Sequence, residues 1–406
     1  MSTLKVDNIR HNNATSDAIT MASDGTCTAR ITGMTGGGAL SHRNLVVNGA
    51  MNVAQRGQVT GIGHASGGAG EGFGGPDRFQ FQANYSIATM SQSTDVPSGQ
   101  GFAKSLKLDV TTAGGDSNAA TYTQLEYRFE GQELTRLKYG TSSAETTTLC
   151  FWIKSPKAGI HWVRLYGDEL SHSGGGAAFI SRKYTVSSAN TWQKVTLRFP
   201  GFTTDGFNND NTLGMRLSWY FAQGSAYSSG TAQADDGDWL NWGDANDRAR
   251  NTVGQVNCFD STSNDIFITG VQFEVGDTPT SFEHRTYTDE LLRCQRYFTY
   301  VPSGTVFPGR GNSGSSYIYS YQSTVPMRVS PTIGVSNDIA HGTFSVRRYR
   351  DGTGVSDSTS TPTTSSTYFS PNSNMIHLIQ GGFSGADDRS ATLFVGGGAI
   401  TISAEL

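Results

Sequence analysis

Between residues 44 and 286 the sequence holds ten short runs dominated by β-branched or aromatic residues, and clusters of Gly, Asn, Asp or Ser separate them. Runs of this kind, without a helical period between them, are typical of an antiparallel sandwich or barrel rather than of alternating strand–helix units. The expected strands are 44–47, 78–81, 105–110, 122–129, 147–153, 160–166, 179–186, 193–199, 215–221 and 266–275.

Composition supports an all-β chain. Charged residues make up 16% of the sequence and 50 of the 406 residues are Gly, which argues against coiled coils and charged disorder and favours strands joined by tight turns. The 21 Phe, 16 Tyr and 6 Trp residues can still build a sizeable core. A formal net charge of −4 gives no electrostatic reason to expect nucleic acid as a partner.

No segment indicates export or membrane insertion. The first ten residues lack the apolar region of a signal peptide, and no window approaches the ~18 apolar residues of a membrane span. The cysteines, Cys27, Cys150, Cys258 and Cys294, form no C-x-x-C pair, so we expect free thiols in a protein made in a reducing cytoplasm. The eight histidines contain no pair at metal spacing, and we expect neither a metal nor a cofactor.

Four regions are predicted. Residues 1–43 form a tether whose short alternating pieces bury too little apolar surface to fold alone, so this segment is disordered, winds with copies of itself or docks on a partner. Residues 44–286 form the sandwich, 287–298 a connector helix, and 299–406 a small distal β domain. Thr286 and Asp289 have the spacing of a capping box at the start of the helix.

Shorter features complete this organisation. Residues 131–138 are compatible with a short helix, while 61–76, with eight glycines in sixteen residues, and the Ser/Thr-rich 352–374 are expected to be surface loops. The strands expected in the distal domain are 317–321, 332–335, 344–349, 375–379, 392–395 and 399–404. Because the last of these runs almost to Leu406, we expect the end of the chain to be held in a sheet.

The most informative polar cluster lies at 235–242. Two tryptophans stand three residues apart beside acids and an amide, a composition that suits a sugar site, because Trp faces stack on pyranose rings while Asp and Asn orient hydroxyls. The candidate glycan-binding residues are Trp239, Trp242, Asp235, Asp236, Asp238 and Asn241. An ordinary loop with packed tryptophans and solvated acids fits the same composition, and a bound Ca²⁺ is a third interpretation.

Other motifs give weaker indications of a binding or catalytic site. A basic spot is formed by Arg347, Arg348 and Arg350. It either keeps an exposed strand edge from pairing with another chain or contacts an anionic surface polymer. The G-x-G-x-x-G spacing at 70–75 precedes a strand rather than a helix, which favours an ordinary glycine-rich loop over a dinucleotide site. Trp152, Trp162 and Trp192 lie within strand patterns and are expected in the core. No catalytic set can be named, and we expect no enzyme activity.

Several segments, taken together and in order, resemble proteins of one group. The segments are 44–57 (NLVVNGAMNVAQRG), 77–81 (DRFQF), 151–159 (FWIKSPKAG), 268–276 (ITGVQFEVG) and 280–285 (TSFEHR). They resemble the jelly-roll domain of bacteriophage tail-fibre and appendage proteins, especially marine and cyanobacterial ones, a domain similar to carbohydrate-binding jelly-roll modules. Residues 287–298 look like the helix that joins such domains to a distal β unit, 326–332 like a segment of that unit, and 4–9 with 19–25 like the virion-attachment stretch.

The resemblance implies a homotrimeric virion component that attaches to other virion proteins through residues 1–43 and binds host surface polysaccharide or lipopolysaccharide. It also implies synthesis in the host cytoplasm and release by lysis, with no membrane insertion and no residue-level site to carry over. Three copies would turn weak sugar contacts into avidity. The alternatives are a capsid-bound decoration or whisker protein with the same domains, and a tailspike depolymerase that cleaves host polysaccharide.

Overall fold

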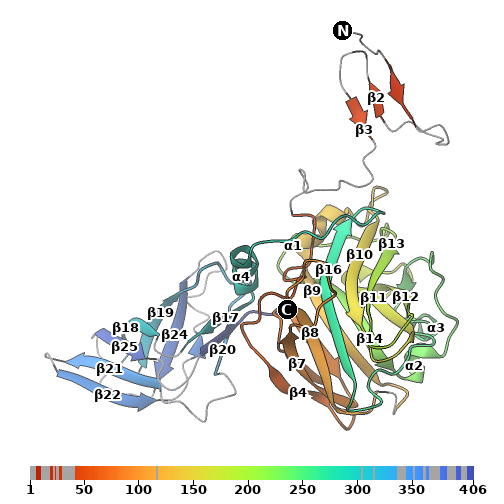
Figure 1. Ribbon diagram of the computed structural model, residues 1–406. Coiled ribbons are helices and arrows are strands. Elements are labelled where there is room, and N and C mark those ends of the chain that lie inside the picture. The colour runs from red at the N-terminus through yellow and green to blue at the C-terminus, as the bar shows by residue number, and fades with distance from the viewer. Residues whose placement is uncertain are drawn as a thin grey trace.

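The computed structural model describes residues 6–10, 19–21, 23, 27–29, 42–115, 118–302, 305–313, 316–335, 344–350, 353–359, 363–364, 375–381, 390–394 and 400–406. Two face-to-face sheets form the largest part of the molecule, and a smaller β unit lies beside them (Figure 1). Neighbouring strands are antiparallel, so the predicted all-β class with an antiparallel jelly-roll sandwich is confirmed.

The first sheet of the sandwich has six strands. In spatial order they are β13 (Trp192–Phe199), β10 (Thr147–Lys154), β16 (Asp265–Val275), β8 (Ser105–Thr112), β7 (Ser86–Ser93) and β4 (Val59–His64). The second sheet has seven: β15 (Leu240–Asn241), β12 (Ala177–Val186), β11 (Gly159–Ser171), β14 (Leu213–Gln223), β9 (Tyr122–Glu130), β6 (Phe79–Ala83) and β5 (Gly70–Phe73). Nine of the ten expected strands are therefore present, with ends shifted by a few residues.

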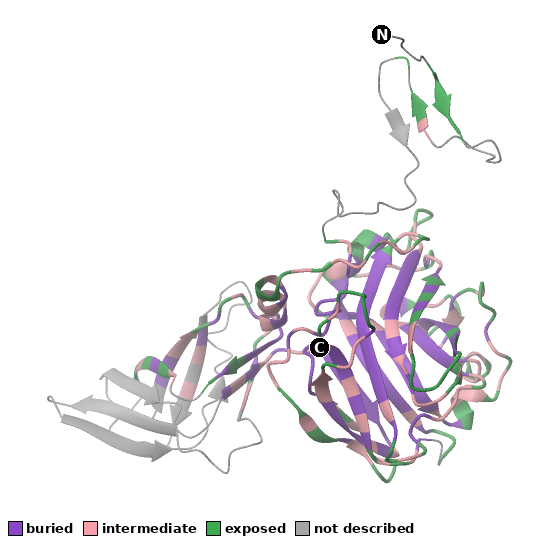
Figure 2. Cartoon of the chain, in the orientation of Figure 1, coloured by how far each residue is buried: buried purple, intermediate pink, exposed green. Residues whose placement is uncertain are grey.

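The core lies between these two sheets, whose strands are largely coloured as buried in Figure 2. Alternate residues of each strand point inward, and aromatic rings from both sheets meet there. The Trp219 ring centroid lies 5.7 Å from that of Phe151, and Phe79 lies 5.4 Å from Tyr127. Each large side chain buried in this way contributes roughly 1.5–3 kcal/mol, so the aromatic strand residues account for much of the stability.

The prediction of a strand at 44–47 is wrong. The side chain of Asn44 makes hydrogen bonds that backbone groups would make in a strand. Its Oδ1 accepts from the backbone N–H groups of Val46 and Phe273, at 3.0 and 3.1 Å. Its Nδ2 donates to the Val271 carbonyl at 3.0 Å. The segment consequently runs beside β16 as a buried turn, since an asparagine that satisfies backbone groups locally competes with regular pairing.

The prediction of a loop at 61–76 is also wrong in part. β4 joins the edge of the six-stranded sheet and β5 the edge of the seven-stranded sheet, so the glycine-rich segment crosses between them. A Cβ at Gly70 would lie 2.1 Å from the backbone carbon of Gly63. Glycine is needed here because the two edge strands approach each other at backbone distance.

The helices are short. α1 (Gly131–Leu134) with the 3-10 turn Thr135–Leu137 confirms the short helix expected at 131–138, and α2 (Ser225–Ser228) and α3 (Ala245–Arg248) lie in the loops beyond β14. α4 (Tyr287–Gln295) begins as predicted, because the Thr286 side chain accepts from the Asp289 N–H at 3.2 Å. None of the described helices has the length and apolar character needed to cross a bilayer.

The distal unit contains two small sheets. One has the order β17 (Phe298–Val301), β26 (Ile400–Ser403) and β20 (Thr332–Val335); the other is β22 (Thr353–Thr359), β21 (Phe344–Arg350), β25 (Ser390–Phe394), β18 (Val306–Ser313), β19 (Ser316–Gln322), β24 (Met375–Gly381) and β23 (Thr363–Thr364). The six strands expected there are confirmed. The end of the chain is held in a sheet, because β26 lies between β17 and β20 with Ile400 and Ile402 fully buried.

The Ser/Thr-rich segment 352–374 is only partly the loop that was predicted. β22 pairs with β21 from Phe344 opposite Thr359 to Arg350 opposite Thr353. An edge strand needs no apolar face, and Thr favours extended backbone, so a polar sequence can form this strand. Residues 360–362 and 365–374 lie outside the described residues.

Buried charges join the distal unit to the sandwich. Glu405, which follows β26, places its carboxylate 2.5 Å from an Arg78 guanidinium nitrogen and 3.1 Å from one of Arg56. The Arg78 guanidinium also lies 3.4 Å from the centroid of the Tyr297 ring. The end of the chain is thereby anchored to the start of β6.

The tether contributes three short strands, β1 (Asn8–Ile9), β2 (Ile19–Met21) and β3 (Cys27–Ala29), which form their own antiparallel sheet. Ile9 pairs with Ile19, and two-residue alternation puts Met21 on the same face. The side chains of Ile9 and Met21 are 49% and 37% exposed. This small sheet thus presents apolar residues to the outside.

Candidate functional site

The predicted glycan site at 235–242 is not assembled as expected. Trp239 is only 5% exposed, its Nε1 donates to the Pro200 carbonyl at 3.0 Å, and its ring packs against Phe202 and Tyr139 at centroid distances of 5.2 and 5.8 Å. The stacking role predicted for Trp239 is wrong, because the indole belongs to the core and has no face open to a pyranose.

Trp242 is half-buried and is engaged from within the chain. The Tyr227 ring stacks on it at 5.9 Å with an interplanar angle of 10°, and the Arg164 guanidinium lies 4.8 Å from its centroid. Phe179 and Tyr166 approach it edge-on at 5.1 and 5.5 Å. The sugar-stacking role predicted for Trp242 is therefore not supported, since aromatic and cationic neighbours occupy its surroundings.

The polar residues of the 235–242 cluster are either exposed to solvent or hydrogen-bonded within local turns. Asp235 and Asp236 are exposed, and Asp235 lies 3.5 Å from Lys183. Asp238 accepts from the Trp239 N–H at 2.8 Å, and the buried Asn241 accepts from the Gly243 N–H at 2.8 Å. Within the described residues no group of three or more His, Cys, Asp or Glu side chains is placed to hold a metal ion.

The predicted basic spot falls on β21, where Arg347 lies opposite Thr392 and Arg348 opposite Ala391 of β25. The side chains of Arg347, Arg348 and Arg350, on which the predicted anionic contact depends, lie outside the described residues.

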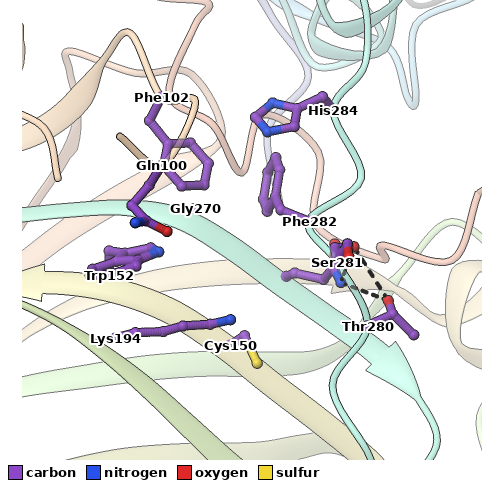
Figure 3. A pocket seen from close by; sticks show the side chains of 11 residues that line it. Gln100, Phe102, Cys150, Trp152, Lys194, Gly270, Thr280, Ser281, Phe282 and His284 are labelled. Atoms are coloured by element: carbon purple, nitrogen blue, oxygen red, sulfur yellow. Dashed lines mark hydrogen bonds between the residues drawn. The ribbon is translucent and has the colours of Figure 1, made fainter. Parts of the chain in front are cut away.

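A cavity that the sequence did not predict lies on the outer face of the six-stranded sheet (Figure 3). Its volume is about 310 Å³. We call it the sheet cavity; its walls are Gln100, Phe102, Cys150, Trp152, Lys194, Gly270, Gln272, Thr280, Ser281, Phe282 and His284. Strands β10, β13 and β16 supply its floor, and the segments before β8 and after β16 supply its sides.

Strand alternation turns Trp152 into this cavity. Leu149, Phe151 and Ile153 of β10 point into the core, so Cys150 and Trp152 between them point outward. Trp152 is half-buried, whereas Trp162 is fully buried as predicted. The expectation that Trp152 lies in the core is wrong because a strand pattern alone does not say which face a residue occupies.

Gly270 allows the aromatic groups to come together. It interrupts the β10–β16 register between Cys150 and Trp152, and its φ of +62° favours glycine. A Cβ at this position would lie 2.6 Å from Phe102 Cζ and 3.0 Å from Trp152 Cδ1. The absence of a side chain at residue 270 thus leaves room for both rings above β16.

The opposite wall is aromatic as well. Phe102 and Phe282 meet edge to face with centroids 5.0 Å apart, and His284 lies 5.4 Å from Phe102 and 4.8 Å from Phe282. Burial lowers the pKa of His284, so the imidazole is neutral at neutral pH. The wall is therefore an uncharged surface against which an apolar ligand face can pack.

The remaining walls carry polar groups, several of them fixed by hydrogen bonds. The Gln272 amide donates to Glu274 at 2.8 Å and to Thr280 Oγ1 at 3.1 Å, and it accepts from the Glu283 N–H at 2.8 Å. Burial raises the pKa of the Cys150 thiol, whose Sγ lies 3.4 Å from Thr196 Oγ1. A protonated thiol is a poor nucleophile, so the cavity is better suited to binding than to covalent chemistry.

A second cavity, of about 300 Å³, lies in the distal unit and is lined by Pro308, Gly309, Arg310, Ile318, Ser320 and His377. Among the wall residues that the structure describes there is no Phe, Tyr or Trp, unlike in the sheet cavity. Aromatic faces next to amides, hydroxyls and an ammonium are the groups that recognise a sugar ring, so the sheet cavity is the better candidate.

Comparisons with known proteins give partial structural likenesses. No family model and no curated protein sequence matches the chain. Among solved structures, the enzymatically active domain of a tailspike protein from bacteriophage CBA120 is 13% identical over 57% of this chain, with a TM-score of 0.29, and the match spans 21% of the tailspike structure.

Two further matches span nearly the whole of smaller proteins. A putative sugar-binding protein from Bacteroides thetaiotaomicron is 11% identical over 58% of this chain and all of its own length, with a TM-score of 0.29. A xylan-binding domain from Paenibacillus barcinonensis is 10% identical over 59% of this chain and 99% of its own, with a TM-score of 0.27. At these values the likenesses identify neither a family nor a ligand for this chain.

Proposed function

We propose that this chain is a saccharide-binding structural component of a phage tail fibre or appendage, and that the sheet cavity holds the sugar. The observation that carries the binding role is the outward Trp152 ring, which faces an uncharged aromatic wall across a cavity edged by amide, hydroxyl and ammonium groups. A binding role without covalent chemistry fits the protonated Cys150 thiol.

The virion role rests on the sequence resemblance, and the structure supports treating its segments as one unit. Segments 44–57 and 280–285 are far apart in the chain but contact each other: Glu283 accepts from the Asn44 N–H at 2.8 Å, and Arg285 donates to the Asn44 carbonyl at 2.7 Å. These two resembling segments therefore pack against each other beside β16.

Replacing Trp152 with Ala is expected to weaken saccharide binding at least about thirtyfold, because the variant loses the ring that stacks on the sugar. A glycan array covering neutral and acidic oligosaccharides identifies the strongest ligand of the wild-type chain, and calorimetric titration with that ligand compares the variants. Tyr300→Ala is the matched control, since Tyr300 is an aromatic residue of β17 with 42% exposure and lies outside the cavity.

Unchanged affinity in Trp152→Ala, with the fold intact by circular dichroism, would remove the sheet cavity as the sugar site. New reducing ends released from the bound glycan would instead favour the depolymerase alternative. Antibody labelling of intact particles separates an appendage from a capsid decoration protein.

The tether is proposed to hold three copies together. Its three-stranded sheet exposes Ile9 and Met21 on one face, and a sheet this small is not stable without a covering surface. Two further copies of the same sheet can cover these residues around a three-fold axis, which is the arrangement that the resemblance implies.

Light scattering of the full chain is expected to give three times the 43.4 kDa chain mass. Ile9→Asp combined with Met21→Asp is expected to give monomers, because the charges oppose burial of that face, whereas Thr20→Asp, on the opposite face, leaves the mass unchanged. A monomeric wild-type chain at micromolar concentration would refute the trimer.

A further inference from the structure

The described walls of the sheet cavity carry a positive charge and no negative one. Among its eleven wall residues Lys194 is the one with a permanent charge, and none is Asp or Glu. On this basis, and resting on the proposed saccharide function, we propose that the cavity selects a carboxylated sugar residue, such as a hexuronate, and that the Lys194 ammonium holds its carboxylate.

Lys194 is placed next to the stacking ring. It lies directly opposite Trp152 in the β10–β13 register, and residues so paired project from the same face of the sheet. Its side chain is exposed, and no carboxylate of the described residues lies within salt-bridge distance of it. The ammonium is consequently available to a ligand that stacks on Trp152.

Asp95 and Glu274, two acids on the segments that form the cavity, already have partners. The Asp95 carboxylate lies 2.6 Å from Lys154 Nζ and accepts from Trp192 Nε1 at 2.8 Å. Glu274 accepts from Gln272 and from the Thr280 hydroxyl, the latter at 2.6 Å, and lies 3.8 Å from Arg43. An entering carboxylate therefore meets one uncompensated cation and no unpaired anion in the described surroundings.

These features divide recognition between two parts of the ligand. Trp152 with the Phe102, Phe282 and His284 wall contacts the apolar faces of a sugar ring, which acidic and neutral sugars share. The ammonium adds a charge-assisted hydrogen bond that only the acidic sugar can make. Because Lys is a flexible point charge, the site tolerates different carboxylate positions and selects a chemical class rather than one sugar.

The test uses two matched pairs of ligands on the full chain: tri-galacturonate against its methyl ester, and sialyllactose against lactose. These pairs distinguish a hexuronate from a sialic acid as the source of the carboxylate. The wild-type chain is expected to bind the acidic member of at least one pair about tenfold more tightly than the neutral member. Raising sodium chloride from about 50 mM to about 500 mM is expected to reduce this preference.

Substitutions then assign the preference to one residue. Lys194→Met keeps the aliphatic stem and is expected to remove the preference while retaining binding of the neutral member; Lys194→Arg is expected to keep it. Lys183→Met is the control, because Lys183 is an exposed lysine outside the cavity.

The outcomes separate the two proposals. Equal binding of acidic and neutral members by the wild-type chain, with binding still lost in Trp152→Ala, would overturn the acidic preference and leave the saccharide function standing. A preference that persists in Lys194→Met would exclude Lys194 as its source. Failure of the wild-type chain to bind any glycan would overturn both proposals.

Discussion

Replacing Glu405 with Gln is expected to lower the free energy of unfolding by about 3 kcal/mol, because it leaves the buried Arg78 guanidinium without its carboxylate partner. The Glu405 carboxylate lies 2.5 Å from Arg78 and 3.1 Å from Arg56, and the Arg78 side chain is 1% exposed. Burial opposes the charge on Arg78, and the carboxylate of Glu405 helps to hold the pKa of Arg78 well above its usual value. An arginine is protonated at neutral pH even without such a partner, so Arg78 stays charged in the variant. Removing one member of a buried ion pair costs far more than removing an exposed pair.

Urea denaturation at neutral pH, followed by tryptophan fluorescence, measures this loss. Glu145→Gln makes the same chemical change in an exposed pair, with Lys138 at 2.6 Å, and is expected to cost less than about 1 kcal/mol. Because Glu405 joins the distal unit to the sandwich, Glu405→Gln is also expected to speed proteolytic cleavage near residues 296–302. Equal stability of the two variants would show that this junction does not depend on the ion pair.

The second large effect is a pH dependence that originates at Asp77. Burial raises the pKa of Asp77 from 3.8 to about 6, against the opposing influence of Arg56 and of the hydrogen bonds from Gln55. Between the two values the folded chain binds more protons at this group than the unfolded chain does. The contribution of Asp77 to stability is therefore highest below about pH 4 and falls by about 3 kcal/mol as the pH rises through 6.

Asp77→Asn carries no charge at any pH, so this loss is absent in the variant. The free energy of unfolding of Asp77→Asn minus that of the wild-type chain is expected to rise by about 2.4 kcal/mol between pH 4 and pH 7. The pH slope is compared rather than the absolute stability, since the Asn side chain cannot accept both bonds from Gln55, at 2.6 and 3.0 Å. Asp235→Asn, at an exposed carboxylate, is the control; a difference that stays flat with pH would contradict the buried assignment.

Most strands could be predicted from the sequence because their residues alternate and because turn residues bound them. The exceptions have local physical causes. The side chain of Asn44 satisfies backbone groups that a strand would pair, and Gly70 lets two edge strands approach at backbone distance. Residues 353–359 form an edge strand from a sequence too polar to predict one.

The candidate site was harder to predict, because residues that are neighbours in the sequence do not form a binding site together. Trp239 and Trp242 stand beside three acids, yet the fold places one ring in the core and surrounds the other with Tyr227, Phe179 and Arg164. The sheet cavity instead gathers residues from 100 to 284. The one local signal was the alternation in β10, where Trp152 has the opposite parity to Leu149, Phe151 and Ile153.

The sequence by itself determined the all-β class, the strand positions, the cap of the connector helix and the strand that ends the chain, because these depend on residues close together along the backbone. Only the tertiary structure decided which face of the six-stranded sheet carries an open aromatic surface, that Lys194 lies beside Trp152, and that Glu405 meets Arg78 across 327 residues. Such contacts depend on strand order and register, which place distant residues together and which no local pattern encodes.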